Sequence, residues 1–219
     1  MIKPIVPKRD VLVGAVALVV LVVCMTIVRD GTVSAAEADV FDAVNGLPEW
    51  LEPPMTAMQY LGVLVVPLVF AAVAAALRRW WLALALALVA PLKLLVEKGV
   101  IKSIVERQRP GTTIGEDAIL RGDVKAFGSS FPSGHAVIAF AIAWLLFCYL
   151  PRSWRWAPIA IGCLVLFARV YLGAHNPLDV VAGAAAGLLI GAVIDAVVRP
   201  RERDEHDRRL ASTLRETPA

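Results

Sequence analysis

Cysteine and histidine are scarce in this chain, which has only three of each among its 219 residues. Cys24, Cys148 and Cys163 all lie within apolar runs, where a free cysteine usually serves as a small packing residue. We therefore expect neither a disulfide framework nor a thiolate metal site. Histidine, aspartate and glutamate are also not clustered in a way that predicts a bound metal or another cofactor.

Charged residues make up only 19% of the chain, and the net charge is +3. So small an excess gives no reason to expect a nucleic-acid partner. Hydrophobic residues make up 58%, whereas soluble domains average about 45–50%. Because a membrane-crossing helix needs roughly 20 apolar residues, the long apolar runs predict an all-α, multi-pass protein of the plasma membrane. Six runs are candidates for transmembrane helices, at residues 11–28, 57–77, 80–101, 132–150, 156–174 and 178–198.

The first apolar run and the segments outside the runs complete the predicted organisation of the chain. The first run follows basic residues, as in a signal peptide, but no small-residue cleavage site follows it directly, so we expect a retained first helix. Between the first two runs, Ser34 and Glu37 form a capping-box pattern that predicts a short amphipathic helix at the membrane interface. We expect residues 1–198 to form one membrane domain and the mixed-charge residues 199–219 to form a cytoplasmic tail.

The distribution of lysine and arginine predicts the orientation. With the N-terminus in the cytoplasm, the inner segments carry most of the basic residues, whereas the 29–56 segment is predominantly acidic. Six crossings would return the C-terminus to the cytoplasm. Three polar clusters, which are far apart in the sequence, would then all reach the extracytoplasmic face and could form one site.

The first polar cluster follows the third apolar run. If the helix continued, Lys102 and Arg109 would share one face, and Pro110 would then end the helix. Such cations at a membrane surface can bind phosphate, but they can equally form a basic rim that snorkels to lipid headgroups. Charges that interrupt an apolar run usually face a protein interior or a polar cavity. The third run contains three of them, namely Lys93, Glu97 and Lys98.

The second cluster, Pro132-Ser133-Gly134-His135, begins the fourth apolar run. The free N–H groups of a helix N-terminus bind anions, and a glycine lets the backbone approach a phosphate closely. Ser133 adds a hydroxyl donor, and His135 titrates near neutral pH, which suits proton transfer. The alternative is an ordinary capped helix start with a histidine at the interface.

The third cluster consists of Arg169, His175 and Asp179. Asn176 and Pro177 are typical of an N-cap and a first helical residue, so Asp179 should lie in the first turn of the sixth helix. The carboxylate could then hold one imidazole nitrogen of His175 and leave the other free, as in hydrolase triads. Pairing of Asp179 with the helix dipole alone is the structural alternative.

Together the clusters read Lys-x6-Arg-Pro, Pro-Ser-Gly-His and Arg-x5-His-x3-Asp. This pattern resembles the signature of the type-2 phosphatidic acid phosphatase superfamily, which includes membrane lipid phosphatases, bacterial prenyl-diphosphate phosphatases and vanadium haloperoxidases. Every signature position is present, and the similarity spans about residues 100–195. Ala168 stands where many members have a serine before the arginine, which removes one hydroxyl contact.

The resemblance implies a role for each signature residue. His175 would be the nucleophile that forms a phosphohistidine, Asp179 would orient it, and His135 would protonate the leaving oxygen and then help to activate water. The phosphate oxygens would be held by Lys102, Arg109, Ser133, Gly134 and Arg169. Arg107 is a further candidate, because a second arginine could contact the second phosphate of a diphosphate, although a surface or headgroup contact explains it equally well.

We therefore expect a metal-independent hydrolase of phosphoric esters or acid anhydrides. The first choice of reaction is conversion of a polyprenyl diphosphate to polyprenyl phosphate on the extracytoplasmic face. Phosphatidic acid and phosphatidylglycerol phosphate are alternative substrates, and phosphate transfer to another lipid or a sugar is an alternative reaction. A small-molecule transporter with a path lined by the charges of the third run is the non-enzymatic alternative, and it would leave the histidine motifs unused.

Overall fold

The computed structural model describes the backbone of residues 7–216 and the side chains of residues 7–199. Within this part of the chain every regular element is a helix, and the one strand-like pairing is an isolated bridge between Gln108 and Ser129. The predicted all-α fold class is confirmed. Residues 1–6 of the predicted membrane domain and 217–219 of the predicted tail lie outside the described residues.

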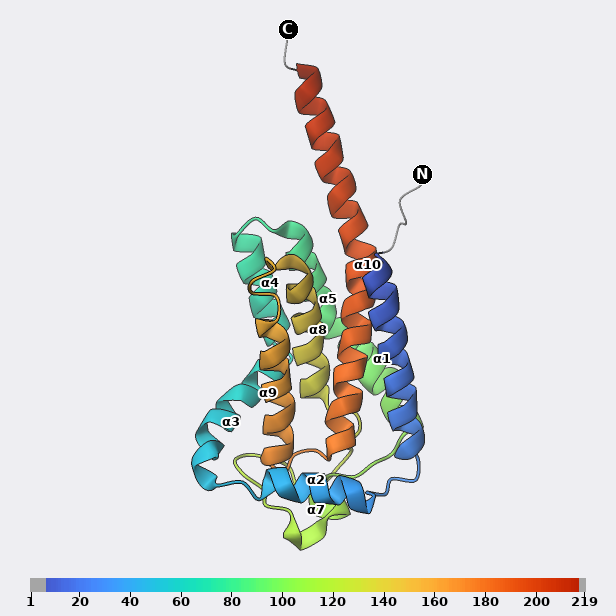
Figure 1. The fold of residues 1–219 in the computed structure, drawn as a ribbon, viewed down its shortest axis with the longest axis vertical. Coiled ribbons are helices and arrows are strands. Elements are labelled where there is room, and N and C mark those ends of the chain that lie inside the picture. Colours follow the sequence, from blue (N-terminus) through green and yellow to red (C-terminus); the bar gives the residue numbers. More distant parts are fainter. Residues whose placement is uncertain (1–6, 217–219) are drawn as a thin grey trace.

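Long helices form an elongated bundle, and each predicted apolar run overlaps one of them (Figure 1). The run at 57–77 differs from the prediction, because a bend between Gly62 and Val66 interrupts it. The fourth, α8, packs between α9 and α10, and α10 also packs along α1. The last helix continues past the bundle to Glu216, so the mixed-charge tail begins within the same helix as the sixth apolar run. The bundle helices are α1 (Lys8–Ile27), α4 (Val66–Ala76), α5 (Trp80–Val96), α8 (Gly134–Tyr149), α9 (Ala157–Tyr171) and α10 (Pro177–Glu216).

Helix length and composition support a membrane protein without fixing the number of crossings. Among the described residues, α1 and the Pro177–Arg199 part of α10 are long and apolar enough to cross a membrane. A third crossing results if Glu49–Gly62 and Val66–Ala76, which meet at a bend of 68°, form one broken span. The apolar helices α8 and α9 are shorter. Six crossings therefore stay a prediction.

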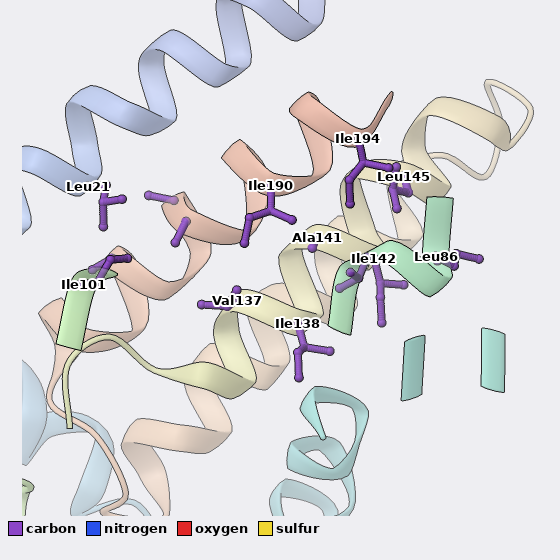
Figure 2. Close-up of a cluster of buried hydrophobic side chains, with 14 of the residues drawn as sticks. Leu21, Leu86, Ile101, Val137, Ile138, Ala141, Ile142, Leu145, Ile190 and Ile194 are labelled. Atoms are coloured by element: carbon purple, nitrogen blue, oxygen red, sulfur yellow. The ribbon is translucent and has the colours of Figure 1, made fainter. Parts of the chain in front are cut away.

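The core of the bundle surrounds α8. This helix is buried from Ala136 to Leu145, as expected of a helix that is apolar on every side. Side chains from α1, α5, α8 and α10 meet there in one hydrophobic cluster (Figure 2). A glycine lets α10 approach closely, since a Cβ on Gly183 would lie 2.5 Å from the Ser133 carbonyl oxygen. This contact sets the first turn of α8 beside the first turns of α10.

Short helices close the end of the bundle that lies opposite the two chain termini (Figure 1). One of them, α2, packs against α9 and α10. It begins as predicted, because the Ser34 hydroxyl accepts a hydrogen bond from the Glu37 N–H at 3.3 Å. The short helices are α2 (Ala35–Asn45), η1 (Glu49–Leu51), α3 (Glu52–Gln59), η2 (Tyr60–Gly62), α7 (Pro110–Thr113) and η4 (Gly115–Asp117).

The helix of the third apolar run does not reach Arg109. After α5 comes a π-helical turn, η3 (Glu97–Ile101), and a last turn, α6 (Lys102–Ile104). Arg109 is the extended N-cap residue of α7, because proline disfavours a helical conformation in the residue before it. The predicted helix face shared by Lys102 and Arg109 is therefore wrong, and Pro110 begins a helix instead of ending one.

Candidate active site

Hydrogen bonds join the three polar clusters at the end of the bundle that the short helices close. The Ser133 N–H donates to the Asp179 carbonyl oxygen at 2.9 Å, which links the second cluster to the third. Arg109 Nη1 donates to the Ala174 carbonyl oxygen at 3.1 Å, which links the first cluster to the third. Within the third cluster, the Arg169 carbonyl oxygen accepts from the His175 N–H at 3.3 Å.

A buried carboxylate links Lys102 to Gly134. Glu97 Oε1 lies 2.7 Å from Lys102 Nζ, and Glu97 Oε2 lies 2.6 Å from Lys93 Nζ. A Cβ on Gly134 would lie 2.7 Å from Glu97 Oε2 and 3.0 Å from Lys93 Nζ, so a larger residue at this position would push both side chains aside. Lys93 and Glu97 thus face the protein interior, as predicted for charges at membrane depth, whereas Lys98 is exposed.

A serine stands between His175 and Asp179. The His175 Nδ1 atom is 3.1 Å from Ser130 Oγ but 3.7 Å from Asp179 Oδ2, and Ser130 donates its own hydrogen bond to that carboxylate oxygen. The hydroxyl therefore accepts from Nδ1–H, and this tautomer leaves the Nε2 lone pair available for attack. Sequence reasoning missed Ser130, whose only signal was its position two residues before Pro132.

The surroundings of His175 keep its imidazole uncharged at neutral pH. Burial is the main cause that lowers the pKa of His175 to about 4. The nearby carboxylate of Asp179 opposes this shift, and the positive charges of Arg169 and Arg109 reinforce it. An uncharged imidazole is the form that can act as a nucleophile.

Asp179 is fully buried, and different groups hold its two carboxylate oxygens. Oδ2 accepts from the Asn176 N–H at 2.8 Å as well as from Ser130. Oδ1 lies 3.0 Å from Arg107 Nη1. Arg107 was a sequence candidate for contact with a second phosphate, but its fully buried guanidinium lies behind Asp179. Its partners are Asp179, Glu37 and the Thr32 carbonyl oxygen.

Several buried donors in the site have no hydrogen-bond partner in the described part of the chain, namely Ser133 Oγ, Arg169 Nε and Asn176 Nδ2. An unpaired buried polar group is costly and calls for an explanation. Ser133 is the N-cap residue of α8, where free backbone N–H groups also favour an anion. Arg169 is held by Gln59, whose Oε1 accepts from its Nη1. Together these donors suit a phosphate group.

His135 lies in the first turn of α8, beside an apolar cavity. Gly62 packs against it so closely that a Cβ there would lie 2.6 Å from His135 Cβ. The residues next to this contact, Leu61 and Ala139, line a cavity of about 200 Å³ between α4, α8 and α9. Further along, the cavity is lined by Phe70, Ile142, Leu146, Ile161 and Val165, among others. A hydrocarbon chain could occupy such a space.

One group of side chains among the described residues could share a metal ion, and it lies at the other end of the bundle. It consists of Asp10, Cys148 and Asp195, at the start of α1, the end of α8 and the outer part of α10. Arg9 and Arg199 already donate hydrogen bonds to Asp195. The candidate active site contains no such group within residues 7–199.

A family model described as the PAP2 superfamily matches residues 78–203, which is more than half of the chain. Three curated relatives are informative. A decaprenylphosphoryl-5-phosphoribose phosphatase of Mycobacterium tuberculosis is 35% identical over 106 residues, which are 48% of this chain and 55% of that protein. An undecaprenyl-diphosphatase of Sulfolobus acidocaldarius is 37% identical over 89 residues, 40% of this chain and 42% of that protein. Phosphatidylglycerophosphatase B of Bacillus subtilis is 33% identical over 184 residues, 78% of this chain and 86% of that protein.

A solved structure has the same fold. The crystal structure of the PAP2-type phosphatidylglycerolphosphate phosphatase of Bacillus subtilis aligns with a TM-score of 0.64 at 23% identity, over 88% of this chain and 96% of that chain. The alignments with the first curated relatives cover only 30% and 55% of those proteins, which is less than two thirds of their length in each case.

Proposed function

The chain belongs to the PAP2 superfamily, and we propose that it is an integral membrane lipid phosphatase that works through a phosphohistidine at His175. One observation carries this proposal. The buried, uncharged imidazole of His175 has its Nδ1 held by Ser130 and Asp179, and it lies among buried donors that lack partners. A nucleophile with an orienting carboxylate, beside an anion-binding helix start, suits phosphoryl transfer.

In the first step, His175 Nε2 attacks the terminal phosphorus, and the bond from phosphorus to the leaving oxygen breaks. His135, which is protonated when the negative charge of the bound phosphate lies beside it, gives its proton to that oxygen, so a lipid alcohol leaves or, from a diphosphate, a lipid monophosphate leaves. Asp179 stabilises the positive charge that develops on the imidazole. The phosphate oxygens are held by Lys102, Arg109, Ser133, the Gly134 N–H and Arg169.

In the second step, the same groups release the phosphate. His135, now neutral, takes a proton from a water molecule as the water oxygen attacks phosphorus. The nitrogen–phosphorus bond breaks, Nε2 of His175 regains its lone pair, and inorganic phosphate leaves. No step in this sequence requires a metal ion, so we propose a metal-independent reaction.

We place a polyprenyl diphosphate first as the substrate, and phosphatidic acid and phosphatidylglycerol phosphate second. The apolar cavity beside His135 supports a substrate with a hydrocarbon chain. Lys93, which shares Glu97 with Lys102, supplies a cation beyond the signature set and could contact a second phosphate. Arg107 no longer supports a diphosphate substrate, because its guanidinium is fully buried against Glu37 and Asp179.

We also propose a multi-pass topology with six crossings, both termini in the cytoplasm and the active site on the extracytoplasmic face. The start of α1 and the end of α10 lie at one end of the bundle, and α2 and α7 lie at the other (Figure 1). This arrangement fits an even number of crossings, and the basic inner segments fix its direction. The transporter alternative loses its motivation, because Lys93 and Glu97 are buried and paired with each other beside Lys102 and Gly134.

The test is phosphate release by detergent-purified protein from a panel of these three lipids, with and without EDTA. We expect activity in EDTA for wild type, none for His175→Ala, and normal activity for His206→Ala in the tail. Equal yields of inorganic phosphate and dephosphorylated lipid would indicate hydrolysis, and a shortfall of phosphate would indicate transfer to an acceptor. Normal activity of His175→Ala, or activity that EDTA abolishes and Mg²⁺ restores, would contradict the proposal.

A further inference from the structure

A glutamate from the loop helix α2 reaches the catalytic carboxylate through an arginine. Glu37, in the first turn of α2, is only 6% exposed. Its Oε1 lies 3.0 Å from Arg107 Nη1, and its Oε2 lies 2.5 Å from Arg107 Nη2. This is the two-pronged geometry that makes an arginine–carboxylate pair rigid and directional. The same Nη1 atom then contacts Asp179 Oδ1 at 3.0 Å.

The chain Glu37–Arg107–Asp179 is buried throughout, since Arg107 and Asp179 have no exposed surface. Asp179 therefore uses one carboxylate oxygen for Arg107 and the other for Ser130, which contacts His175. Glu37 makes a second contact with the same region, because its Oε1 also accepts from the Leu178 N–H at 2.9 Å. The position of Asp179 is thus fixed from the side that faces away from the histidine.

The charge of Glu37 also affects the site electrostatically, in addition to its role in docking α2. In this buried chain one arginine stands between two carboxylates, so one negative charge is left over. That charge can stabilise the imidazolium that forms on His175 during phosphoryl transfer. Without the charge of Glu37, Asp179 would be neutralised by Arg107 alone, and the positive charge on His175 would lose its counterion.

We propose that Glu37 is a positioning residue for the reaction, acting through Arg107 to hold Asp179 and to keep its negative charge available to His175. The inference rests on the proposed function, since it assigns a role within the same site. Glu37 lies outside residues 78–203, the region that the family model matches. The signature clusters could not have indicated it.

The experiment compares Glu37→Gln with a matched control on the same helix. The substitution keeps the shape of the side chain and removes its charge. Asn45→Ala is the control, because Asn45 anchors the other end of α2 to Ile119 and Tyr171 and touches no residue of the His175 chain. Both variants should weaken docking of α2, but only the first should disturb Asp179.

For Glu37→Gln we expect kcat for lipid phosphate hydrolysis to fall about 10- to 100-fold, the range that misplacement of a catalytic group produces, with KM changed by less than about threefold. The rate of phosphohistidine formation after rapid quenching should fall in parallel. Asn45→Ala should keep kcat within about threefold of wild type, even if its melting temperature is lowered as much as that of Glu37→Gln. Glu37→Asp, which keeps the charge, should recover part of the lost rate.

Equal losses of kcat in Glu37→Gln and Asn45→Ala at matched melting temperature would overturn the inference, because they would leave Glu37 only a docking role. If Glu37→Gln does not fold, the comparison passes to Glu37→Asp and Asn45→Ala. A normal kcat for every folded Glu37 variant also overturns the inference. Failure of the proposed function would be recognised differently: the wild-type protein would release no phosphate from the lipids, or His175→Ala would release it at the normal rate.

Discussion

Ser130→Ala is the most direct test of how His175 is held. In the structure the hydroxyl bridges His175 Nδ1 and Asp179 Oδ2, which are themselves 3.7 Å apart. That separation is too long for a good hydrogen bond, so the imidazole would lose its link to the carboxylate. Asp179 is not free to close the gap, because Arg107 and the Asn176 N–H hold its two oxygens.

The size of the effect follows from the kind of hydrogen bond that is lost. Hydrogen bonds to charged groups contribute about 1.5–3 kcal/mol. If all of this is lost from the transition state, kcat falls by about 10- to 150-fold, since about 1.4 kcal/mol corresponds to a factor of ten. KM should change little, because Ser130 lies behind the imidazole and not among the phosphate donors.

The assay is kcat at saturating lipid, together with the rate of phosphohistidine formation. Ser129→Ala is a matched control, because the neighbouring serine is exposed. We expect it to behave as wild type. A Ser130→Ala variant that matches the Ser129→Ala control in both measurements would refute the argument that the hydroxyl connects His175 to Asp179.

Three further predictions test the remaining parts of the site and the topology. His175→Ala should form no phosphohistidine, whereas His135→Ala should lose about 10²–10⁴-fold in kcat and still form some intermediate from a substrate with a good leaving group. Because the pKa of His175 is lowered to about 4, phosphohistidine formation should persist as the pH falls below about 6.5 and be lost only as the imidazole is protonated near pH 4. If phosphohistidine formation is instead half lost near pH 6.5, the imidazole is not desolvated. In a cysteine-free background, Leu47→Cys and Asp117→Cys should react with an impermeant thiol reagent in whole cells and Glu205→Cys only after lysis, and the reverse pattern would place the active site in the cytoplasm.

Local signals in the sequence were enough to predict where two of the helices begin. The capping pair of Ser34 and Glu37 begins α2, and Pro177 is the first residue of α10, because these preferences depend on a few neighbouring residues. The meeting of the three clusters was also predictable. Each cluster adjoins an apolar run on the same predicted side of the membrane, and helices of one bundle bring such ends together.

The partners of buried charges were not predictable. Arg107 looks in the sequence like a second phosphate ligand beside Arg109, yet its partner Glu37 lies 70 residues earlier in the chain. A local sequence pattern does not distinguish an arginine that faces a substrate from one that is fully buried against two carboxylates. Ser130 and Gln59 were missed for the same reason, since their roles depend on His175 and Arg169, which only the tertiary structure brings near.

The contact of Lys102 with Glu97 has a geometric cause that also explains how the site is built. In a regular α-helix each residue advances by about 100°, so Lys102 would point about 140° away from Glu97, five positions earlier. Lys102 nevertheless contacts Glu97 on the same side as Lys93, because the π-helical turn η3 joins residues that are five positions apart. An uninterrupted α-helix would aim the signature lysine away from Gly134. The π-helical turn therefore delivers Lys102 to the candidate phosphate site, and a 3.6-residue period applied to the sequence could not have shown it.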